Sequence, residues 1–503
     1  MSPSLHSTMW FTFFLSCSIS LLHHASSSSV SPLSHTKLLD SMDGFQNYTA
    51  ISDFRLVNRR KLGACLGKNP YRKIQVNSKS ELSDDQMITV TVSGVLLPSK
   101  SDWVGMITPS NANINACPQN VILYQQTGDL SAQPLLCHYP VKAQFVSNDP
   151  DYIGCKKKEC KKYDQMGKCL VTTCSASITF HVINIRTDIQ FVFFGAGFQT
   201  PCVLAISELL KFSNPKKPLY GHLSSVDSTG TSMRLTWVSG DKKNQGRITT
   251  HVETSDAQIH SECTYNSLRV IEASALPSPA VDFGWHDPGY IHSAVMTGLK
   301  PSTSFSYRYG SNSAGWSAKI NFKTPPSGGS NELKFLAFGD MGKAPRDASI
   351  EHYIQPGSIA VTQAMADEIS SGNVDSIFHI GDISYATGFL VEWDFFLHLI
   401  TPVASQVSYM TAIGNHERDY VSSGSLYITP DSGGECGVPY ESYFPMPTPA
   451  KDKPWYSIEQ GSVHFVVIST EHDWSRNSEQ YQWMSRDMAS VDRSRTPWLI
   501  FTG

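Results

Sequence analysis

Three short apolar runs, each closed by glycine and a polar residue, constrain this chain more than any other feature. The runs extend from Leu333 to Phe338, from Ile377 to Ile380 and from Tyr409 to Ile413. Their length and their Ile- and Phe-rich composition are typical of buried strands, and the segments between them are typical of helices. This alternation predicts a parallel sheet whose strands end at one edge, where open α/β sheets bind ligands.

The polar residues that close these runs form a candidate metal site. They are Asp340, Asp382 with Tyr385, and Asn415 followed by His416. Such ligands suit iron, manganese or zinc, and their number favours two metals rather than one. A single Gly-Asp pair at a strand end is more often a turn or a helix cap. The prediction therefore rests on three clusters that occur together and in order.

The three clusters resemble the first three motifs of the metallophosphoesterases. Tyr385, in the pattern Gly381-Asp382-x-x-Tyr385, is particular to the purple acid phosphatases. The chain is thus similar to a plant-type large purple acid phosphatase, closely from Pro218 to Gly503 and more loosely before that. The resemblance implies an acid phosphatase that hydrolyses phosphate monoesters at a dinuclear centre of ferric iron and divalent zinc, manganese or iron.

The resemblance also implies a role for each residue of the site. Asp340 and Tyr385 would hold the ferric iron, Asp382 would bridge the metals, and Asn415 would hold the divalent metal. A carboxylate with one oxygen for each metal is the simplest bridge. His416 would not bind metal but would face the phosphate, as a donor to its oxygens or as a general acid.

Three neighbouring residues receive other interpretations. His472 follows a predicted strand at the same sheet edge and is a candidate substrate contact. Glu417 is predicted to orient the loop of its motif instead of binding metal. His379 lies inside its strand, where a packed or hydrogen-bonded histidine is the more common case.

Two other functions stay open from the sequence. One is a nucleotide pyrophosphatase or phosphodiesterase of the same family, which would share these motifs. The other is a non-catalytic secreted binding protein. The family places further histidine ligands after a strand that matches Pro497 to Gly503, and no earlier histidine has their context. We therefore expect a C-terminally truncated catalytic domain, and the missing histidines favour the non-catalytic alternative for the chain as it stands.

The N-terminus predicts secretion. The apolar run from Met9 to Leu22 is shorter than the ~20 residues of a membrane span and is followed by small residues, so residues 1–28 are expected to be a cleaved signal peptide. Asn47 lies in a glycosylation sequon. The expected location is extracellular, in the cell wall or apoplast, or vacuolar, with no membrane attachment.

The cysteines support an oxidising compartment. Most of them lie between residues 65 and 202, and we expect a disulfide framework there whose pairing the sequence does not specify. The cysteines concerned are Cys65, Cys117, Cys137, Cys155, Cys160, Cys169, Cys174 and Cys202. The alternative is a metal site formed by Cys155, Cys160, Cys169 and Cys174. The absence of a Cys-x-x-Cys motif disfavours it. Cys436 is either free or paired with Cys263.

At 503 residues the chain is too long for one core, so several domains are expected. Alternating patterns predict a Cys-rich β-sandwich-like domain at 50–212, in which Lys156 to Lys162 is a basic loop. A fibronectin type III-like domain follows at 216–324. Phe305 occupies the position expected for the tyrosine of a tyrosine corner, so the hydroxyl of that motif is absent there. The truncated catalytic domain spans 332–503, and Asn477 with Gln480 is expected to form a capping box.

Composition limits the partners. With 40% hydrophobic and 17% charged residues the chain is typical of globular proteins. A net charge of -4 argues against nucleic-acid binding. The expected partner is a phosphorylated small molecule, and no residue pattern predicts an oligomeric state.

Overall fold

The computed structural model describes residues 63–65, 69–77, 81–110, 140–198, 201–240, 265–269, 286–330, 332–421 and 423–503. All of them belong to one compact unit, Ala50–Gly503. The expected signal peptide and Asn47 lie outside the described residues, as do Cys117, Cys137 and Cys263.

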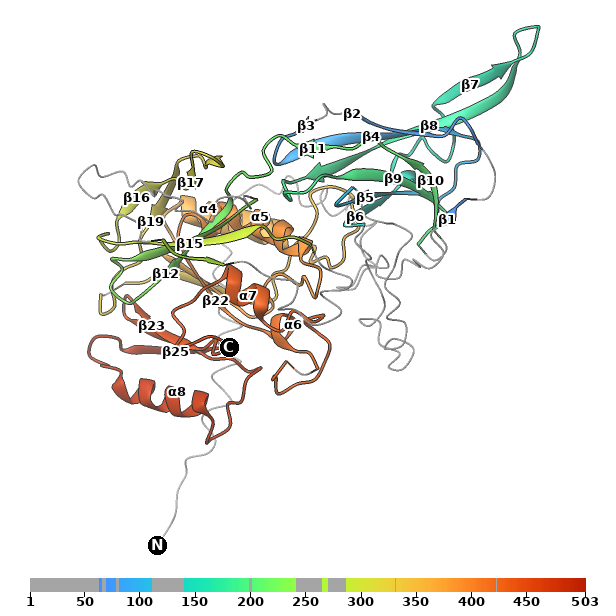
Figure 1. The fold of residues 1–503 in the computed structure, drawn as a ribbon. Helices are drawn as coiled ribbons and strands as arrows, with labels where there is room; N and C mark the ends of the chain where they lie inside the picture. Colours follow the sequence, from blue (N-terminus) through green and yellow to red (C-terminus); the bar gives the residue numbers. More distant parts are fainter. Residues whose placement is uncertain are drawn as a thin grey trace, which may run out of the picture. The chain divides into compact units, whose positions relative to one another are not determined.

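The first part of the unit is a sandwich of two sheets (Figure 1). Strand β4 buries Ile88, Val90 and Val92 on alternate positions, and Phe180 meets Phe191 across the two sheets at 4.9 Å between ring centres. One sheet has the order β1 (Gly63–Ala64), β10 (Cys202–Ile206), β9 (Gln190–Gly195), β5 (Trp103–Ile107) and β6 (Lys142–Phe145). The other has the order β2 (Lys73–Asn77), β4 (Gln86–Val95), β8 (Cys169–Val182) and β7 (Lys158–Tyr163), and β3 (Glu81–Leu82) pairs separately with β11 (Lys211–Phe212).

The cysteines proposed for the alternative metal site form disulfide bonds instead. Cys155 pairs with Cys174, Cys160 with Cys169, and Cys65 with Cys202. Cys436 is not paired with any cysteine that the structure describes. The expected disulfide framework is thus confirmed for these pairs.

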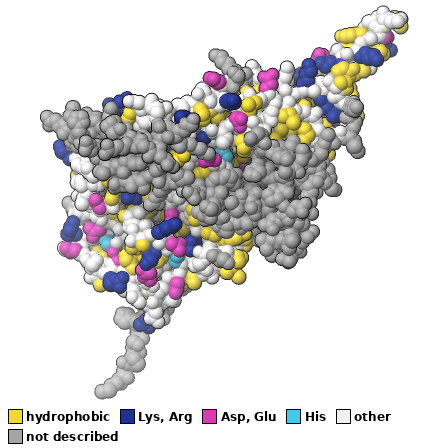
Figure 2. All heavy atoms as spheres, in the orientation of Figure 1, with side chains coloured by type: hydrophobic (Ala, Val, Ile, Leu, Met, Phe, Trp, Pro, Cys, Tyr) yellow, Lys and Arg dark blue, Asp and Glu magenta, His cyan; other side chains and the backbone are white. Residues whose placement is uncertain are grey.

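The basic loop predicted at Lys156 to Lys162 is wrong. Residues 158–163 form strand β7, because β8 continues past the sandwich and supplies a pairing partner. This hairpin carries exposed Tyr163, Met166 and Leu170, and Figure 2 shows Lys side chains beside hydrophobic ones along it.

The second β part has its own core around Trp237, which is buried as expected of an anchor. Phe305 packs in this core without a hydroxyl, and the hydroxyl contacts come later in the chain. Tyr309 Oη accepts from the amide of Gly221 at 2.8 Å, and Tyr307 Oη donates to the carbonyl of Ser405 at 2.9 Å. The sheets are β12 (Leu219–Ser225), β13 (Met233–Ser239), β15 (Tyr290–Met296) and β14 (Tyr265–Arg269), then β16 (Ser304–Tyr307) with β19 (Ile320–Lys323), and β17 (Gly310–Ser311) with β18 (Gly315–Trp316).

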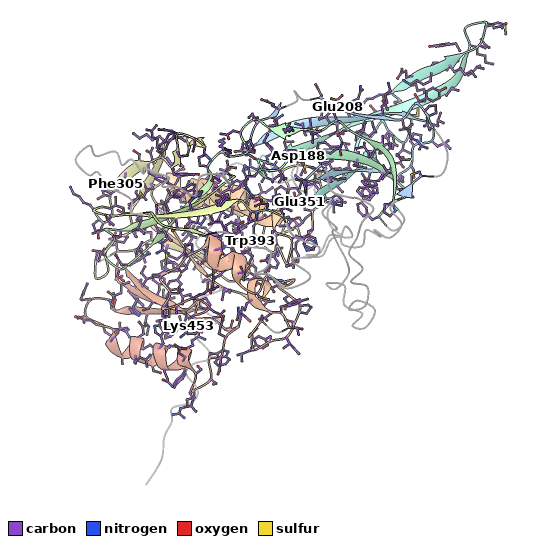
Figure 3. All side chains as sticks on the ribbon, in the orientation of Figure 1. Asp188, Glu208, Phe305, Glu351, Trp393 and Lys453 are labelled. Carbon is purple, nitrogen blue, oxygen red and sulfur yellow. A yellow bond between two sulfur atoms is a disulfide. The ribbon has the colours of Figure 1, made fainter. Side chains whose placement is uncertain are left out.

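The third part is the predicted α/β layer. Strands β20 (Phe335–Phe338), β21 (Ser376–Ile380) and β22 (Ser408–Ala412) are parallel and adjacent. Helix α4 (Ser358–Ser370) connects the first two strands, and α5 (Val391–Ala404) connects the second and third. Helix α5 buries Trp393, which Figure 3 labels, together with Phe396 and Ile400. The fold class, all-β domains followed by an α/β layer, is confirmed.

The rest of this layer contains β23 (Tyr456–Gln460), β24 (Val463–Val467) and β25 (Trp498–Thr502), with short helices α6 (Asn415–Arg418) and α7 (Val438–Tyr443) and helix α8 (Glu479–Ser490). The capping box predicted for α8 is wrong. Ser478 is the N-cap and accepts from the amide of Tyr481, while the buried Gln480 amide bonds the backbone of Ser469. Within the described residues, no helix has both the length and the apolar character of a membrane span.

Candidate dinuclear metal centre

The sheet places the predicted ligands at one edge. Asp340 comes two residues after β20 and Asp382 two residues after β21, while Asn415 begins α6 just beyond β22. The strand-end loops are bonded to one another, since the amide of Asp340 donates to the carbonyl of Gly381 at 3.4 Å. The parallel register, which pairs Phe338 with His379, therefore determines where the side chains meet.

Three of the predicted ligands have left-handed backbone. The φ angles are 56° at Asp340, 50° at Asp382 and 53° at Tyr385. Left-handed backbone is uncommon for residues other than glycine, costs about 1–3 kcal/mol and clusters at functional sites. Space is equally restricted at Gly414, because a Cβ there would lie 2.4 Å from both the amide nitrogen and Oδ1 of Asp382.

Three oxygen-bearing side chains converge at the centre of the site. Tyr385 Oη lies 2.5 Å from Asp340 Oδ1 and 3.3 Å from Asp382 Oδ2. Burial raises the pKa of Asp382, and the nearby Asp340 carboxylate raises it further. Burial and the hydrogen bond to Asp340 raise the pKa of the Tyr385 phenol. Burial therefore disfavours the charged forms of Asp382 and Tyr385 unless a cation compensates the charge.

Asn415 and His416 lie beside this group of oxygens. The amide of His416 donates to Asp382 Oδ1 at 3.2 Å, which connects α6 to the second ligand loop. Asn415 Nδ2 donates to Asp431 Oδ2 at 3.0 Å, and this contact leaves the Asn415 oxygen as its remaining ligand atom. His416 Nδ1 lies 3.2 Å from the carbonyl of Asp431. Because a carbonyl only accepts, Nδ1 carries hydrogen and Nε2 is the ring nitrogen left for a substrate.

Glu417 orients its loop as predicted. Its buried carboxylate accepts from the amide of Ile383 at 2.8 Å and from the amide of Gly414 at 3.1 Å. His379 is packed and hydrogen bonded as predicted, with Nδ1 2.8 Å from Tyr409 Oη, and burial lowers its pKa to about 3.

His472 Nδ1 is hydrogen bonded, whereas its Nε2 is buried without a hydrogen bond in the described part of the chain. Its Nδ1 lies 2.8 Å from Ser469 Oγ and its Nε2 lies 3.5 Å from Asp452 Oδ1. Its ring meets Trp455 edge-on at 5.8 Å. Its role as a substrate contact stays a prediction.

Two residues that the sequence analysis missed contact the site. Asp431 bonds both Asn415 and His416, and the Tyr353 ring stacks on the Tyr385 ring at 4.5 Å between centres. Neither residue follows an apolar run, so the strand-end pattern gives no signal for them. Their contact with the site depends on long loops that return to the sheet edge.

The donor set suits metal binding. Two carboxylates and a phenol share a buried space, yet no Lys or Arg among the described residues forms an ion pair with Asp340 or Asp382. Such a concentration of acidic oxygens is stable when a metal supplies the positive charge. The phenol, carboxylate and amide oxygens are hard ligands.

Fold and site together define a metallophosphoesterase. Residues 333–503 match the model of the calcineurin-like phosphoesterases. Residues 74–214 match the Fn3-like domain from purple acid phosphatase, and residues 218–324 match the purple acid phosphatase N-terminal domain.

Individual relatives give the same result. The chain is 38% identical over 429 residues to "Probable inactive purple acid phosphatase 27" of Arabidopsis thaliana. The matched region covers 84% of the chain and 65% of that relative. It is 42% identical over 189 residues to a nucleotide pyrophosphatase/phosphodiesterase of Hordeum vulgare, over 37% of the chain and 51% of the relative. The solved structure of purple acid phosphatase PPD1 from yellow lupin (Lupinus luteus) seeds superimposes with a TM-score of 0.73 at 32% identity, over 86% of the chain and 72% of that structure.

The protein belongs to the purple acid phosphatase family. It spans less than two thirds of the length of either curated relative.

Proposed function

We propose that the protein is an acid phosphatase that hydrolyses phosphate monoesters at a dinuclear centre of ferric iron and a divalent metal, which is zinc, manganese or iron. The observation that carries this proposal is the convergence of Tyr385 Oη with the carboxylates of Asp340 and Asp382 beside Asn415 and His416. In this proposal Asp340 and Tyr385 would hold the ferric iron, Asp382 would be shared by the two metals, and Asn415 would hold the divalent metal.

The bound metals would supply Lewis acidity and an activated water for attack on phosphorus. The protein's own contribution is to orient groups around the substrate. The Asp431 carbonyl holds the His416 ring, so that Nε2 is left to donate to a phosphate oxygen or to protonate the leaving group when the ring is charged. Glu417 fixes the loops of Asp382 and Asn415 through its two amide contacts.

Two other functions compete with this one. The barley relative's name supports a nucleotide pyrophosphatase or phosphodiesterase, which would use the same ligands. The name of the Arabidopsis relative, "Probable inactive", supports a non-catalytic binding protein. Their tests are a panel of substrates and a measurement of bound metal.

The deciding experiment uses the native purified protein and p-nitrophenyl phosphate near pH 5. We expect Asp382→Ala to lower kcat/KM by at least about 100-fold, because even outer contacts to a metal are worth 10–100-fold in activity. Asp367→Ala, on the exposed side of α4, is the control and should retain activity. Full activity in Asp382→Ala would exclude the dinuclear mechanism.

The substrate panel separates the alternatives. Faster hydrolysis of a phosphodiester or a nucleotide pyrophosphate than of the monoester would favour the second function. An unmodified protein that holds metal but hydrolyses none of them would favour the third.

Secretion is part of the same proposal. The disulfides Cys65–Cys202, Cys155–Cys174 and Cys160–Cys169 support an oxidising compartment. An extracellular or vacuolar location, glycosylation at Asn47 and a phosphorylated small-molecule substrate complete it.

A further inference from the structure

A second group of metal-ligating side chains lies away from the candidate dinuclear centre. It contains Asp85, His181 and His398, and we refer to it as the Asp85 cluster. Asp85 immediately precedes β4 and His181 lies in β8, both in the first sandwich, while His398 lies in α5 of the α/β layer. It shares no residue with the centre described above.

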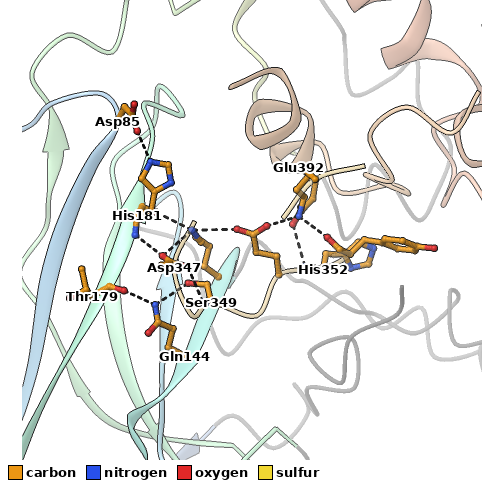
Figure 4. A network of polar contacts seen from close by, with 12 residues as sticks. Asp85, Gln144, Thr179, His181, Asp347, Ser349, His352 and Glu392 are labelled. Atoms are coloured by element: carbon orange, nitrogen blue, oxygen red, sulfur yellow. Dashed lines mark hydrogen bonds and ion pairs between the residues drawn. The ribbon is translucent and has the colours of Figure 1, made fainter. Parts of the chain in front are cut away.

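The ligand atoms already lie close together. Asp85 Oδ1 is 2.6 Å from His181 Nε2 and 3.6 Å from His398 Nε2, and all three atoms lie within 4.8 Å of one another. Figure 4 shows the Asp85 carboxylate directed at the His181 ring. Ligands of a tetrahedral zinc ion sit at about 2.0–2.2 Å from the metal, so they are about 3.3–3.6 Å apart. Small side-chain rotations would bring the cluster to that spacing.

One ring nitrogen of the cluster lacks a hydrogen bond. His398 Nε2 is buried and makes no hydrogen bond within the described part of the chain. Asp85 Oδ1, at 3.6 Å, lies beyond hydrogen-bond distance, so this buried ring nitrogen is an atom that a ligand would satisfy.

The surrounding cations do not fill the cluster. Lys142 Nζ donates to the carbonyl of His181, but its charge is compensated by Asp347 at 3.2 Å and Glu351 at 3.3 Å. Arg346 Nη1 lies 3.8 Å from Asp85 Oδ1 on a side chain that is 41% exposed, so it can move aside. The Asp85 carboxylate is itself 48% exposed and leaves a path for an ion.

We propose that the Asp85 cluster binds a divalent transition-metal ion, with zinc as the best match. Two imidazoles and one carboxylate are a ligand set that zinc uses when its fourth position is left to water. The ion would cross-link strands β4 and β8 of the first sandwich to helix α5. Because it joins segments distant in sequence, it stabilises the folded state and is not a centre of phosphate chemistry.

The test compares zinc content per chain in the full-length native protein and in matched variants, by elemental analysis after gel filtration with limiting zinc. We expect His398→Gln and Asp85→Asn each to lower zinc affinity at least about tenfold. Asp382→Ala, which alters only the candidate dinuclear centre, should retain the zinc of the cluster. The control is His464→Gln, since His464 also pairs with a carboxylate, Asp487 at 2.9 Å, but has no second imidazole beside it among the described residues.

A second measurement covers variants that fold poorly. Zinc should raise the melting temperature of the unmodified protein and of His464→Gln, and this rise should be lost in Asp85→Asn, whose amide oxygen still accepts from His181. Equal zinc content and an equal rise in melting temperature across all variants would overturn the proposal. The cluster would then be an ion-paired contact between the sandwich and α5.

Discussion

Asp431 shows how a single residue outside the predicted motifs shapes the site. Its carboxylate accepts from Asn415 Nδ2 at 3.0 Å and from Thr429 Oγ1 at 2.7 Å, and its carbonyl faces His416 Nδ1. The amide of Asn415 is thereby held in one orientation. If Asn415 binds metal as proposed, this contact would make Asp431 a positioning residue, because outer contacts orient metal ligands.

We predict that Asp431→Ala weakens retention of the divalent metal by about 10–100-fold, the usual effect of losing an outer contact to a ligand. The carbonyl that faces His416 is kept in this variant. The measurement is metal content against chelator concentration, with Asp473→Ala, at an exposed residue, as the control. Identical chelator curves for Asp431→Ala and the unmodified protein would contradict the assigned role.

Tyr385 gives a spectroscopic prediction. A phenolate bound to ferric iron produces a visible charge-transfer band, so the native protein is expected to be purple and Tyr385→Phe colourless. Tyr353→Phe is the matched control, because Tyr353 stacks on Tyr385 at 4.5 Å while its own ring is not a predicted ligand. An unchanged visible spectrum in Tyr385→Phe would rule out the phenolate.

At the scale of elements, helix α5 contacts both β parts of the molecule. It packs against β12 of the second β part, and its Asp394 forms a buried pair with Arg186 of the first. The pair is bidentate, with both N–O distances at 2.7 Å, and His286 Nε2 lies 3.6 Å from the same carboxylate. Removal of one partner leaves the other charge buried.

Asp394→Ala should therefore lower the free energy of unfolding by about 3–5 kcal/mol. The control is Lys156→Ala, which breaks an exposed pair with Asp151 (3.0 Å) and should cost less than about 1 kcal/mol. Urea denaturation of the three proteins measures both values. A cost for Asp394→Ala no larger than that of the control would show that the pair is not needed for stability.

At the scale of the whole molecule, the first sandwich supports the loop that carries Tyr353. Strand β6 pairs with this loop through Ala143 and Ile350, with N–O distances of 2.7 and 3.0 Å. Buried Lys142 of β6 bonds Asp347 and Glu351, and Glu351 in turn bonds Lys343, which also pairs with Glu392 of α5 (Figure 4). Because Lys343 Nζ donates to the carbonyl of Tyr353, this network reaches the ring that stacks on Tyr385.

A buried acid also makes the stability of the whole fold depend on pH. Glu435 accepts from the amide of Gly388 at 3.0 Å and from Trp393 Nε1 at 3.1 Å, and burial raises its pKa from 4.5 to about 8. Between these values the folded chain keeps a proton that the unfolded chain releases. The free energy of unfolding attributable to this group therefore falls as pH rises from about 4.5 to 8, by up to about 1.4 kcal/mol per pH unit.

We predict a shallower decline in Glu435→Gln, which cannot ionise. Denaturation at pH 5, 6.5 and 8 measures the difference from the unmodified protein. Glu368→Gln, at an exposed residue of α4, should keep the original slope. Parallel curves for Glu435→Gln and the unmodified protein would show that Glu435 is not the titrating group.

The sequence was sufficient for the features that depend on neighbours along the chain. Apolar runs predicted β20, β21 and β22, and the parallel arrangement of strands predicted that Asp340, Asp382 and Asn415 would share an edge. The interpretations of His379 and Glu417 came from the same local patterns. The apolar pattern of a strand and the polar residues that follow it are local properties of the sequence, so they can be predicted without the tertiary structure.

Only the tertiary structure decided which distant residues meet. It selected the disulfide partners, it made a strand of residues 158–163 by supplying β8, and it bonded Gln480 to Ser469 instead of to a helix cap. It also brought Asp431 and Tyr353 to the predicted ligands, and His398 to Asp85 and His181. These contacts depend on how separate elements pack, and packing is a property of the whole chain that no local pattern encodes.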